Sequence, residues 1–322
     1  MEGGEGQKLQ ELLQSTHIRE LLPAREIVSA KGSATVAEAL ELLTKHNVLS
    51  MPVWDSTKQQ YGGMVDMEDI VSLFLSTLNS ESSPQVAEWK FAHVPIGSVI
   101  NFSHSDVFLP MEGETSIWHL IEQFTRGIHR IAVLDQHGKV VNIVSQSSVV
   151  KFLNKHMDKL GAAGLKTLRQ INVIEGPLAT ISKDTKALAA LSSLHKEGRV
   201  ADALALVDGE GKFCGALSDS DLRGLGYEMF ARLQLPVSEF VAMQSQRLPL
   251  AKYCCSDDTT LAAAIKRMAK HGLHRLWIVD ESQKPLGVVT LLGIMKALML
   301  VSHRSFHDWQ KKVGAHPPPS AE

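Results

Sequence analysis

The segment Gly215-Ala216-Leu217-Ser218-Asp219-Ser220-Asp221 decides the fold, because it joins the end of an apolar strand to the start of a polar helix. Another apolar strand precedes it at residues 203–208, ends in an Asp, and returns through the polar turn at residues 209–212. Such a connection is typical of a hairpin. Further upstream, apolar residues recur at helical spacing, which predicts an amphipathic helix over residues 187–194. The unit therefore reads helix, strand, strand, helix.

Three other segments repeat this unit. The residues at the predicted helix starts are Asp66, Ser145, Ser218 and Thr290, separated by 79, 73 and 72 positions. Each unit contains a first strand, expected at residues 50–55, 130–135, 203–208 and 275–280. Each also has apolar positions on its upstream helix, at Val36, Ala39, Leu40 and Leu43, at Ile117, Leu120, Ile121 and Phe124, at Ala187, Ala190, Leu191 and Leu194, and at Leu261, Ala264, Ile265 and Met268. A unit of about 60 residues buries little surface alone, so we expect the units to pair into two modules.

The repeats divide the chain into segments. We predict a helical N-terminal extension, four repeats and a C-terminal tail, at residues 1–19, 20–78, 100–157, 172–230, 244–302 and 303–322. Residues 79–84 have loop composition and separate the first two repeats. Residues 159–165 contain two glycines, which favours a hinge between the two pairs of repeats. The apolar stripe that begins at Leu9 is expected to pack on the first pair.

Composition excludes several classes of protein. Lys plus Arg number 33 against 35 Asp plus Glu, a net charge of -2, which argues against nucleic-acid binding and a polybasic membrane anchor. No apolar run approaches the roughly 18 residues of a membrane span. The three cysteines, Cys214, Cys254 and Cys255, form neither a disulfide framework nor a zinc spacing, so we expect a cytoplasmic or nuclear protein.

Motifs of known catalytic machinery are absent from the sequence. It has no phosphate-binding P-loop, no H-E-x-x-H, no nucleophile elbow and no dinucleotide fingerprint. The 14 histidines show no metal-ligand spacing. We therefore expect a protein that is not an enzyme and needs no cofactor or metal.

The Ser-x-x-Asp element is a candidate ribose contact. An Asp three residues into a helix can accept hydrogen bonds from both hydroxyls of a diol, which nominates Asp221 and, in the first repeat, Asp69. The alternative is a capping box, in which these side chains only satisfy the helix's own N–H groups. Asp66 places a carboxylate where a phosphate would approach, and its alternative role is that of a helix N-cap.

Two basic pairs are candidate phosphate contacts. His129-Arg130 and His274-Arg275 are 145 positions apart, as are the helix-start residues Ser145 and Thr290. Repeats 2 and 4 thus share the basic pair, whereas repeats 1 and 3 share the acidic residue. A phosphate suits the fork of an Arg, the donor of a His and the hydroxyl and positive dipole at a helix start, which adds Ser218 to the candidates. The alternative is that the pairs are solvated charges at strand starts.

These residues resemble the cystathionine-β-synthase (CBS) domain family. Its signature is Gly, two apolar residues, Ser or Thr, two variable residues and Asp, which residues 215–221 match fully and residues 63–69 match except at Asp66. Four repeats in one chain, the run at residues 53–59 and the two basic pairs are similar to gamma subunits of AMP-activated and sucrose-nonfermenting-type kinases, including the plant gamma-like type. The resemblance implies an α+β fold, with four CBS repeats paired into two Bateman modules that form a flat disc. It also implies nucleotide clefts between paired repeats and convergence of the basic pairs on phosphate.

The resemblance also implies a function. It indicates a non-catalytic, energy-sensing regulatory subunit that binds AMP, ADP or ATP and associates with a serine/threonine kinase catalytic subunit and a beta-type scaffold subunit. The alternative is a free-standing CBS-domain scaffold whose nucleotide response is lost or altered. The sequence departs from the gamma pattern at Leu49, Ser147 and Gly293, where the family has Arg, Lys and the ribose-binding Asp. Asp202 also stands near the expected centre of the disc.

Overall fold

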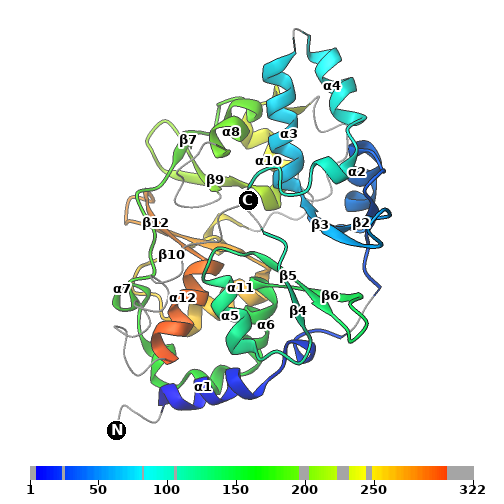
Figure 1. Cartoon of the computed structure of the whole chain (residues 1–322). Helices are drawn as coiled ribbons and strands as arrows, with labels where there is room; N and C mark the ends of the chain where they lie inside the picture. The colour runs from blue at the N-terminus through cyan, green and yellow to red at the C-terminus, as the bar shows by residue number, and fades with distance from the viewer. Residues whose placement is uncertain are drawn as a thin grey trace. The chain divides into compact units, whose positions relative to one another are not determined.

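The computed structural model describes residues 5–23, 26–81, 83–104, 107–195, 203–222, 232–243 and 249–302. The chain forms two compact units, which are described separately (Figure 1). Unit 1 comprises residues 1–25, 109–177 and 248–322, and so contains repeats 2 and 4. Unit 2 comprises residues 26–108 and 178–247, and so contains repeats 1 and 3. Asp202 and the predicted tail at residues 303–322 lie outside the described residues.

Each repeat builds a three-stranded mixed sheet. Its first strand is short and pairs in parallel with the second, which pairs antiparallel with the third. The first strands are β1 (Ala30–Lys31), β4 (Pro110–Glu112), β7 (Thr180–Ser182) and β10 (Cys254–Cys255). The hairpins are β2 (Ser50–Asp55) with β3 (Gln60–Asp66), β5 (Arg130–Leu134) with β6 (Val140–Ser145), β8 (Ala203–Val207) with β9 (Phe213–Ser218), and β11 (Arg275–Val279) with β12 (Pro285–Thr290). The predicted four-repeat α+β class is confirmed.

Helices flank each sheet in the predicted order. The helix between the first and second strands is α2 (Val36–Lys45), α5 (Ile117–Phe124), α8 (Ala187–Leu194) or α11 (Leu261–His271). After the hairpin come α3 (Met67–Ser80), α6 (Gln146–Lys155), the 3-10 helix η4 (Asp219–Leu222) or α12 (Leu291–Ser302). The remaining elements are α1 (Glu5–Ser15), η1 (Ile18–Glu20), α4 (Pro84–Ala92), η2 (Ile96–Ser98), η3 (Met157–Leu165), α7 (Leu168–Ile171), α10 (Val237–Ala242) and η5 (Leu250–Lys252).

The apolar faces predicted for the first helices form the cores. In all four helices, every apolar position named from the sequence is buried. Those of α5 and α11 belong to the core of unit 1, and those of α2 and α8 to the core of unit 2. Helical periodicity therefore reported the buried face correctly, because residues three and four apart share one side of a helix.

The Asp at the end of β2, or directly after β5, β8 or β11, organises the turn of each hairpin. The Oδ1 atom of Asp208 accepts hydrogen bonds from the N–H groups of Glu210 and Lys212, both at 2.9 Å. Asp135 does the same with two N–H groups of its own turn. These bonds stabilise the charged carboxylate, so the hydrogen bond from Lys212 in particular lowers the pKa of Asp208. The recurring Asp is thus a turn residue.

Segments of the chain cross between neighbouring repeats. We call residues 16–23, 94–103, 166–175 and 232–238 the crossing segments; they lead into repeats 1, 2, 3 and 4 and overlap the starts of the first three. Residues 94–103 pack on repeat 1, where Ile96 N–H donates to the Ala34 carbonyl at 2.7 Å. Residues 16–23 pack on repeat 2, residues 166–175 on repeat 4 and residues 232–238 on repeat 3, each through backbone hydrogen bonds. Each crossing segment therefore packs within its own unit, on a repeat other than the one it leads into.

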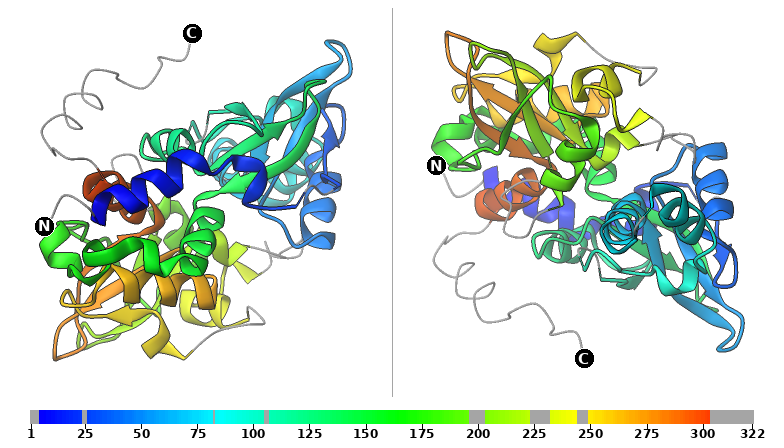
Figure 2. Two further views of the ribbon diagram at one scale, coloured as in Figure 1. Left: turned by 90° about the horizontal axis from the view of Figure 1, so that it is seen from below. Right: turned by 90° about the horizontal axis from the view of Figure 1, so that it is seen from above.

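One expectation about unit 1 is wrong, and a second holds only in part. Residues 159–165 do not form a hinge between pairs of repeats, because they lie within η3, whose Leu160 is buried in the core of unit 1. The N-terminal stripe was expected to pack on the first pair, repeats 1 and 2. Leu9 and Leu13 of α1 are fully buried in the core that repeats 2 and 4 share, so the stripe packs on repeat 2 as expected, but with repeat 4 in place of repeat 1. Figures 1 and 2 show α1 lying beside α12. Local composition identified both segments but could not identify what they pack against.

A close backbone approach in unit 2 gives a first prediction. A Cβ atom at Gly97 would lie 3.0 Å from the Gly32 carbonyl oxygen and 3.2 Å from the Gly32 Cα, and backbone atoms cannot rotate away. We expect Gly97→Ala to lower the free energy of unfolding by about 1–3 kcal/mol, the usual cost of overpacking. Urea denaturation measures it. Gly209→Ala is the control, since nothing lies within 4 Å of its Cβ position. Equal midpoints for the two variants would contradict this packing.

Candidate functional site

The predicted site residues gather at the helix starts that follow the hairpins. In every repeat, the first residue of the second strand lies directly opposite the helix-start residue of the third. These pairs are Ser50 with Asp66, Arg130 with Ser145, Ala203 with Ser218, and Arg275 with Thr290. The hairpin register thereby brings each predicted arginine beside the hydroxyl predicted to share its ligand.

Backbone groups fix the entrance of these helices. The carbonyl of His274 accepts a hydrogen bond from Leu291 N–H at 2.9 Å, and the carbonyl of His129 accepts one from Gln146 N–H at 3.4 Å. In repeat 1 the carbonyl of Leu49 accepts from Met67 N–H at 2.9 Å. The residue before the strand therefore caps the helix through its backbone in all three repeats. Its side chain is left to vary, from Leu49 in repeat 1 to histidine in repeats 2 and 4.

Arg275 has a buried donor. Its Nε atom is buried and has no hydrogen-bond partner among the residues that the structure describes. Buried donors in folded proteins are normally satisfied. An anion bound between Arg275 and Thr290 would satisfy this one.

Repeat 3 presents a hydroxyl and a carboxylate together. Asp221 Oδ2 accepts hydrogen bonds from the N–H of Ser218 at 2.8 Å and from its hydroxyl at 2.9 Å. Ser218 is buried, whereas Asp221 is partly exposed. The capping geometry is present, and the ribose contact of Asp221 remains a prediction.

Repeat 1 encloses its carboxylate more tightly. Asp69 is only 4% exposed and forms a capping box with Asp66, in which each carboxylate accepts the other's backbone N–H. Asp69 Oδ1 also accepts from the N–H of Ser103 at 3.0 Å and from its hydroxyl at 2.7 Å. Asp66 thus takes the N-cap role. Of the two acidic candidates, Asp221 is the more accessible to a ligand.

Repeat 2 has no carboxylate at this position. Ser148 stands three residues after Ser145, and its hydroxyl accepts from the N–H of Ser145 at 3.2 Å. The two basic pairs belong to unit 1, and Asp69 and Asp221 belong to unit 2. The division of charge between even and odd repeats is thus also a division between the units.

One contact in repeat 4 was not predicted from the sequence. Thr290 accepts a hydrogen bond from Gly293 N–H at 3.0 Å, and its own hydroxyl donates to the carboxylate of Glu175 at 2.9 Å. Glu175 lies in the crossing segment that precedes repeat 3, 115 positions away in sequence. No periodicity or spacing within repeat 4 could have indicated it.

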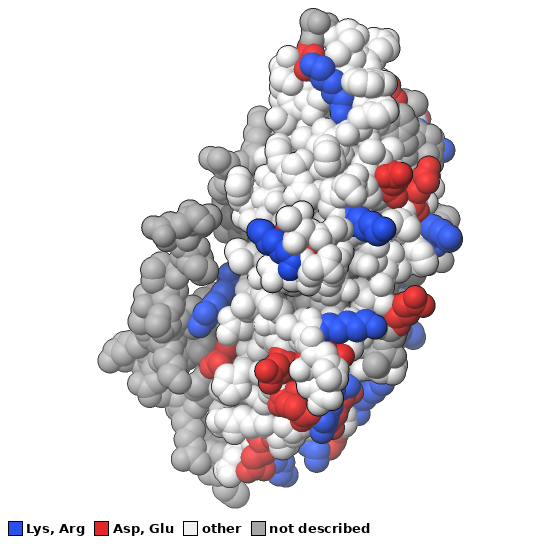
Figure 3. Space-filling view, turned by 45° about the vertical axis from the view of Figure 1, so that its right-hand side comes forward, with Lys and Arg blue, Asp and Glu red and all other residues white. Residues whose placement is uncertain are grey.

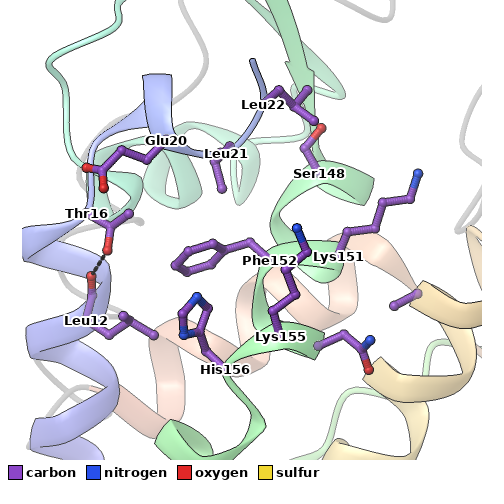
Figure 4. A pocket seen from close by; sticks show the side chains of 12 residues that line it. Leu12, Thr16, Glu20, Leu21, Leu22, Ser148, Lys151, Phe152, Lys155 and His156 are labelled. Carbon is purple, nitrogen blue, oxygen red and sulfur yellow. Dashed lines mark hydrogen bonds between the residues drawn. The ribbon is translucent and has the colours of Figure 1, made fainter.

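Unit 1 also contains a cavity of about 520 Å³ between α1, η1, α6 and α11 (Figure 4). The rings of Phe152 in α6 and of His156 directly after it lie with centroids 4.5 Å apart at an interplanar angle of 41°, opposite Leu12 of α1. None of the predicted phosphate residues lines the cavity in the described part of the chain, and Ser148 stands at its edge. It is therefore distinct from the predicted phosphate contacts.

The adjacent cysteines of β10 give a second prediction, with Cys255 buried and Cys254 partly exposed. Burial is the main cause that raises the pKa of Cys254 to about 11, with the adjacent Cys255 adding to the shift. At pH 8 about one thiol in a thousand is then ionised, and the thiolate is the reactive form. We expect iodoacetamide to alkylate Cys254 far more slowly in the folded chain than in urea, with the rate rising up to about pH 11. Mass spectrometry of the Cys254 peptide measures it, and equal rates in both states would contradict the burial.

Some features are absent from the described residues. They contain no helix long and apolar enough to cross a membrane, and no cluster of side chains suited to a metal ion. On the described part of the face in Figure 3, Lys and Arg side chains are interspersed with Asp and Glu, in line with the net charge of -2.

Comparison with known proteins identifies the repeats. The family model described as "CBS domain" matches residues 18–76, 104–155, 169–227 and 246–300. Among solved structures, protein MJ1225 from Methanocaldococcus jannaschii, described as a proposed archaeal homologue of γ-AMPK, covers 87% of this chain and 99% of its own with a TM-score of 0.66 and 16% identity. At that identity the match shows a shared fold.

Curated relatives are distant and mostly longer. The chain is 28% identical over 275 residues to human 5'-AMP-activated protein kinase subunit gamma-3, covering 82% of this chain and 55% of that protein. It is 24% identical to Protein SDS23 of Kluyveromyces lactis, covering 87% and 62%. It is 23% identical to the SNF1-related protein kinase regulatory subunit gamma-like PV42a of Arabidopsis thaliana, covering 85% and 92%. The chain thus spans little more than half the length of the first two.

Proposed function

Because the chain belongs to the CBS domain family, we propose that it is a non-catalytic regulatory subunit that binds AMP, ADP or ATP and acts on a serine/threonine protein kinase. Distant similarity to gamma subunits supports the kinase as partner. A beta-type scaffold subunit is the second partner in the proposal. Ligand binding would shift the population between arrangements of the repeats, and the kinase would respond to that shift.

One observation carries the nucleotide part of the proposal. In repeats 2 and 4, an arginine at a strand start lies opposite a hydroxyl at a helix start, Arg130 by Ser145 and Arg275 by Thr290. Arg forks, hydroxyls and helix N-termini each favour phosphate oxygens. The buried Nε of Arg275 adds an unsatisfied donor within the described residues. His129 and His274, directly before these arginines, complete the proposed phosphate contacts.

The proposed ribose contact gives a third prediction. Asp221 presents a partly exposed carboxylate at a helix start, whereas the corresponding residue of repeat 2, Ser148, has no charge. A hydrogen bond to a charged group contributes about 1.5–3 kcal/mol, so Asp221→Ala should weaken AMP binding by roughly tenfold or more. Ser148→Ala, the matched control, should leave it nearly unchanged. Calorimetry that finds the same affinity for both variants would remove Asp221 from the site.

The alternative function is a free-standing CBS scaffold with a lost nucleotide response. The enclosure of Asp69 by Asp66 and Ser103 favours this alternative for repeat 1, because its carboxylate oxygens already accept protein hydrogen bonds. Affinity capture of the tagged full chain separates the two functions. The regulatory subunit should retain a kinase catalytic subunit and a scaffold subunit in repeated captures, and a scaffold of the alternative kind should retain neither.

A further inference from the structure

We infer that Glu175 supplies repeat 4 with the carboxylate that Asp221 supplies to repeat 3, so that repeat 4 keeps an anchor for the ribose diol although residue 293 is a glycine. The inference rests on the proposed nucleotide function and assigns to that function a residue outside the family signature.

The first argument is the hydrogen bond that each carboxylate accepts. In repeat 3 the hydroxyl of the helix-start Ser218 donates to Asp221 at 2.9 Å. In repeat 4 the hydroxyl of the helix-start Thr290 donates to Glu175, also at 2.9 Å. In both repeats a carboxylate therefore accepts the hydrogen bond of the helix-start hydroxyl at the same distance.

The second argument is the space at residue 293. A Cβ atom built on Gly293 would lie 3.2 Å from the Val173 carbonyl oxygen and 3.6 Å from both Glu175 Oε1 and Thr290 Oγ1. An Asp side chain at this position would therefore direct its carboxylate into the region that Glu175 fills. The glycine leaves that region open to a side chain from another segment.

The third argument is how firmly the backbone holds Glu175. Its N–H donates to the Val288 carbonyl at 2.8 Å, and its carbonyl accepts from Val288 N–H at 3.0 Å. These two bonds fix Glu175 beside β12, two residues before the Thr290 helix start. Because these hydrogen bonds already order the backbone of Glu175, less conformational entropy is lost when its side chain binds a ligand.

The crossing segment that packs on repeat 1 also contacts a helix-start side chain, through the residue that corresponds to Glu175. Pro95 forms a β-bridge with Thr35, the N-cap of α2, and Ser103 follows Pro95 by eight positions. Likewise Thr167 forms a β-bridge with Thr260, the N-cap of α11, and Glu175 follows Thr167 by eight positions. Ser103 donates its hydroxyl to the helix carboxylate of repeat 1. Repeat 1 therefore has the acid on the helix and the hydroxyl on the crossing segment, and repeat 4 has the reverse.

The test compares AMP with 2',3'-dideoxy-AMP, which keeps the phosphate and lacks the diol. The full chain is titrated calorimetrically in an Asp69→Asn/Asp221→Asn background, which removes the two carboxylates proposed as ribose contacts in repeats 1 and 3. We expect this background still to prefer AMP, and Glu175→Gln to reduce that preference by about tenfold. Glu112→Gln, an exposed acid on β4 of the same unit, is the charge-matched control and should leave the preference unchanged.

Two further variants separate an anchor from a structural contact. Thr290→Val removes the hydrogen bond to Glu175 but leaves the carboxylate in place, so it should weaken AMP and dideoxy-AMP alike and keep their ratio. Adding Gly293→Asp to Glu175→Gln returns a carboxylate to the helix and should restore the preference. The inference would be overturned if Glu175→Gln left the ratio of AMP to dideoxy-AMP affinity unchanged, or if Thr290→Val lowered that ratio as much as Glu175→Gln does. Either result would leave the proposed nucleotide function intact. A wild-type chain that binds neither nucleotide would overturn the proposed function and the inference with it.

Discussion

Replacing either Arg130 or Arg275 with Gln is expected to weaken AMP binding by roughly tenfold or more, because each change removes a charge-assisted hydrogen bond of about 1.5–3 kcal/mol. Gln keeps the length and polarity of the side chain but not the bidentate cationic fork. Both arginines belong to unit 1, and each lies opposite the hydroxyl that starts a helix. Adenosine, which has no phosphate, should lose much less affinity.

The double variant tests whether the two arginines act on one phosphate. Residues that share one ligand group give non-additive effects, so the loss in the double variant should differ from the sum of the two single losses. Calorimetry with AMP, and separately with adenosine, measures the binding free energies of the wild type, the two single variants and the double variant. Arg126→Gln, an exposed arginine just after α5, is the control. If both arginine variants bind AMP like the control, the basic pairs are solvated surface charges.

Truncating Leu13 should cost the most stability of the changes considered. Leu13 is fully buried in α1, within the core that repeats 2 and 4 form. Leu→Ala in a core typically costs about 2–5 kcal/mol, because transfer free energy is lost and a cavity remains. Urea denaturation should show a clearly lower midpoint for Leu13→Ala than for Gln14→Ala, which changes an exposed neighbour on the same helix. Equal midpoints would mean that α1 is not part of that core.

The sequence predicted what depends on neighbours along the chain. Strand starts such as Arg130 and helix starts such as Ser145 were located correctly, because apolar alternation, turn residues and capping residues all act locally. The register that places Arg130 opposite Ser145 follows from the length of the hairpin and its turn.

Contacts between distant segments could not be predicted. Nothing in residues 159–165 indicated that Leu160 would be buried against α1, and two glycines favoured a hinge instead. The crossing segments likewise pack on a different repeat from the one they precede in sequence. For the same reason the sequence indicated that the ribose anchor is lost at Gly293, whereas in the structure the carboxylate of Glu175 lies beside Gly293.

The proposal that this CBS-domain chain is a nucleotide-binding regulator is tested most directly by calorimetric titration of the full wild-type chain with AMP and, separately, with adenosine. The phosphate contacts proposed at Arg130 and Arg275 predict saturable binding of AMP that is at least about tenfold tighter than that of adenosine. A chain that does not bind AMP, or binds AMP no more tightly than adenosine, would contradict the account.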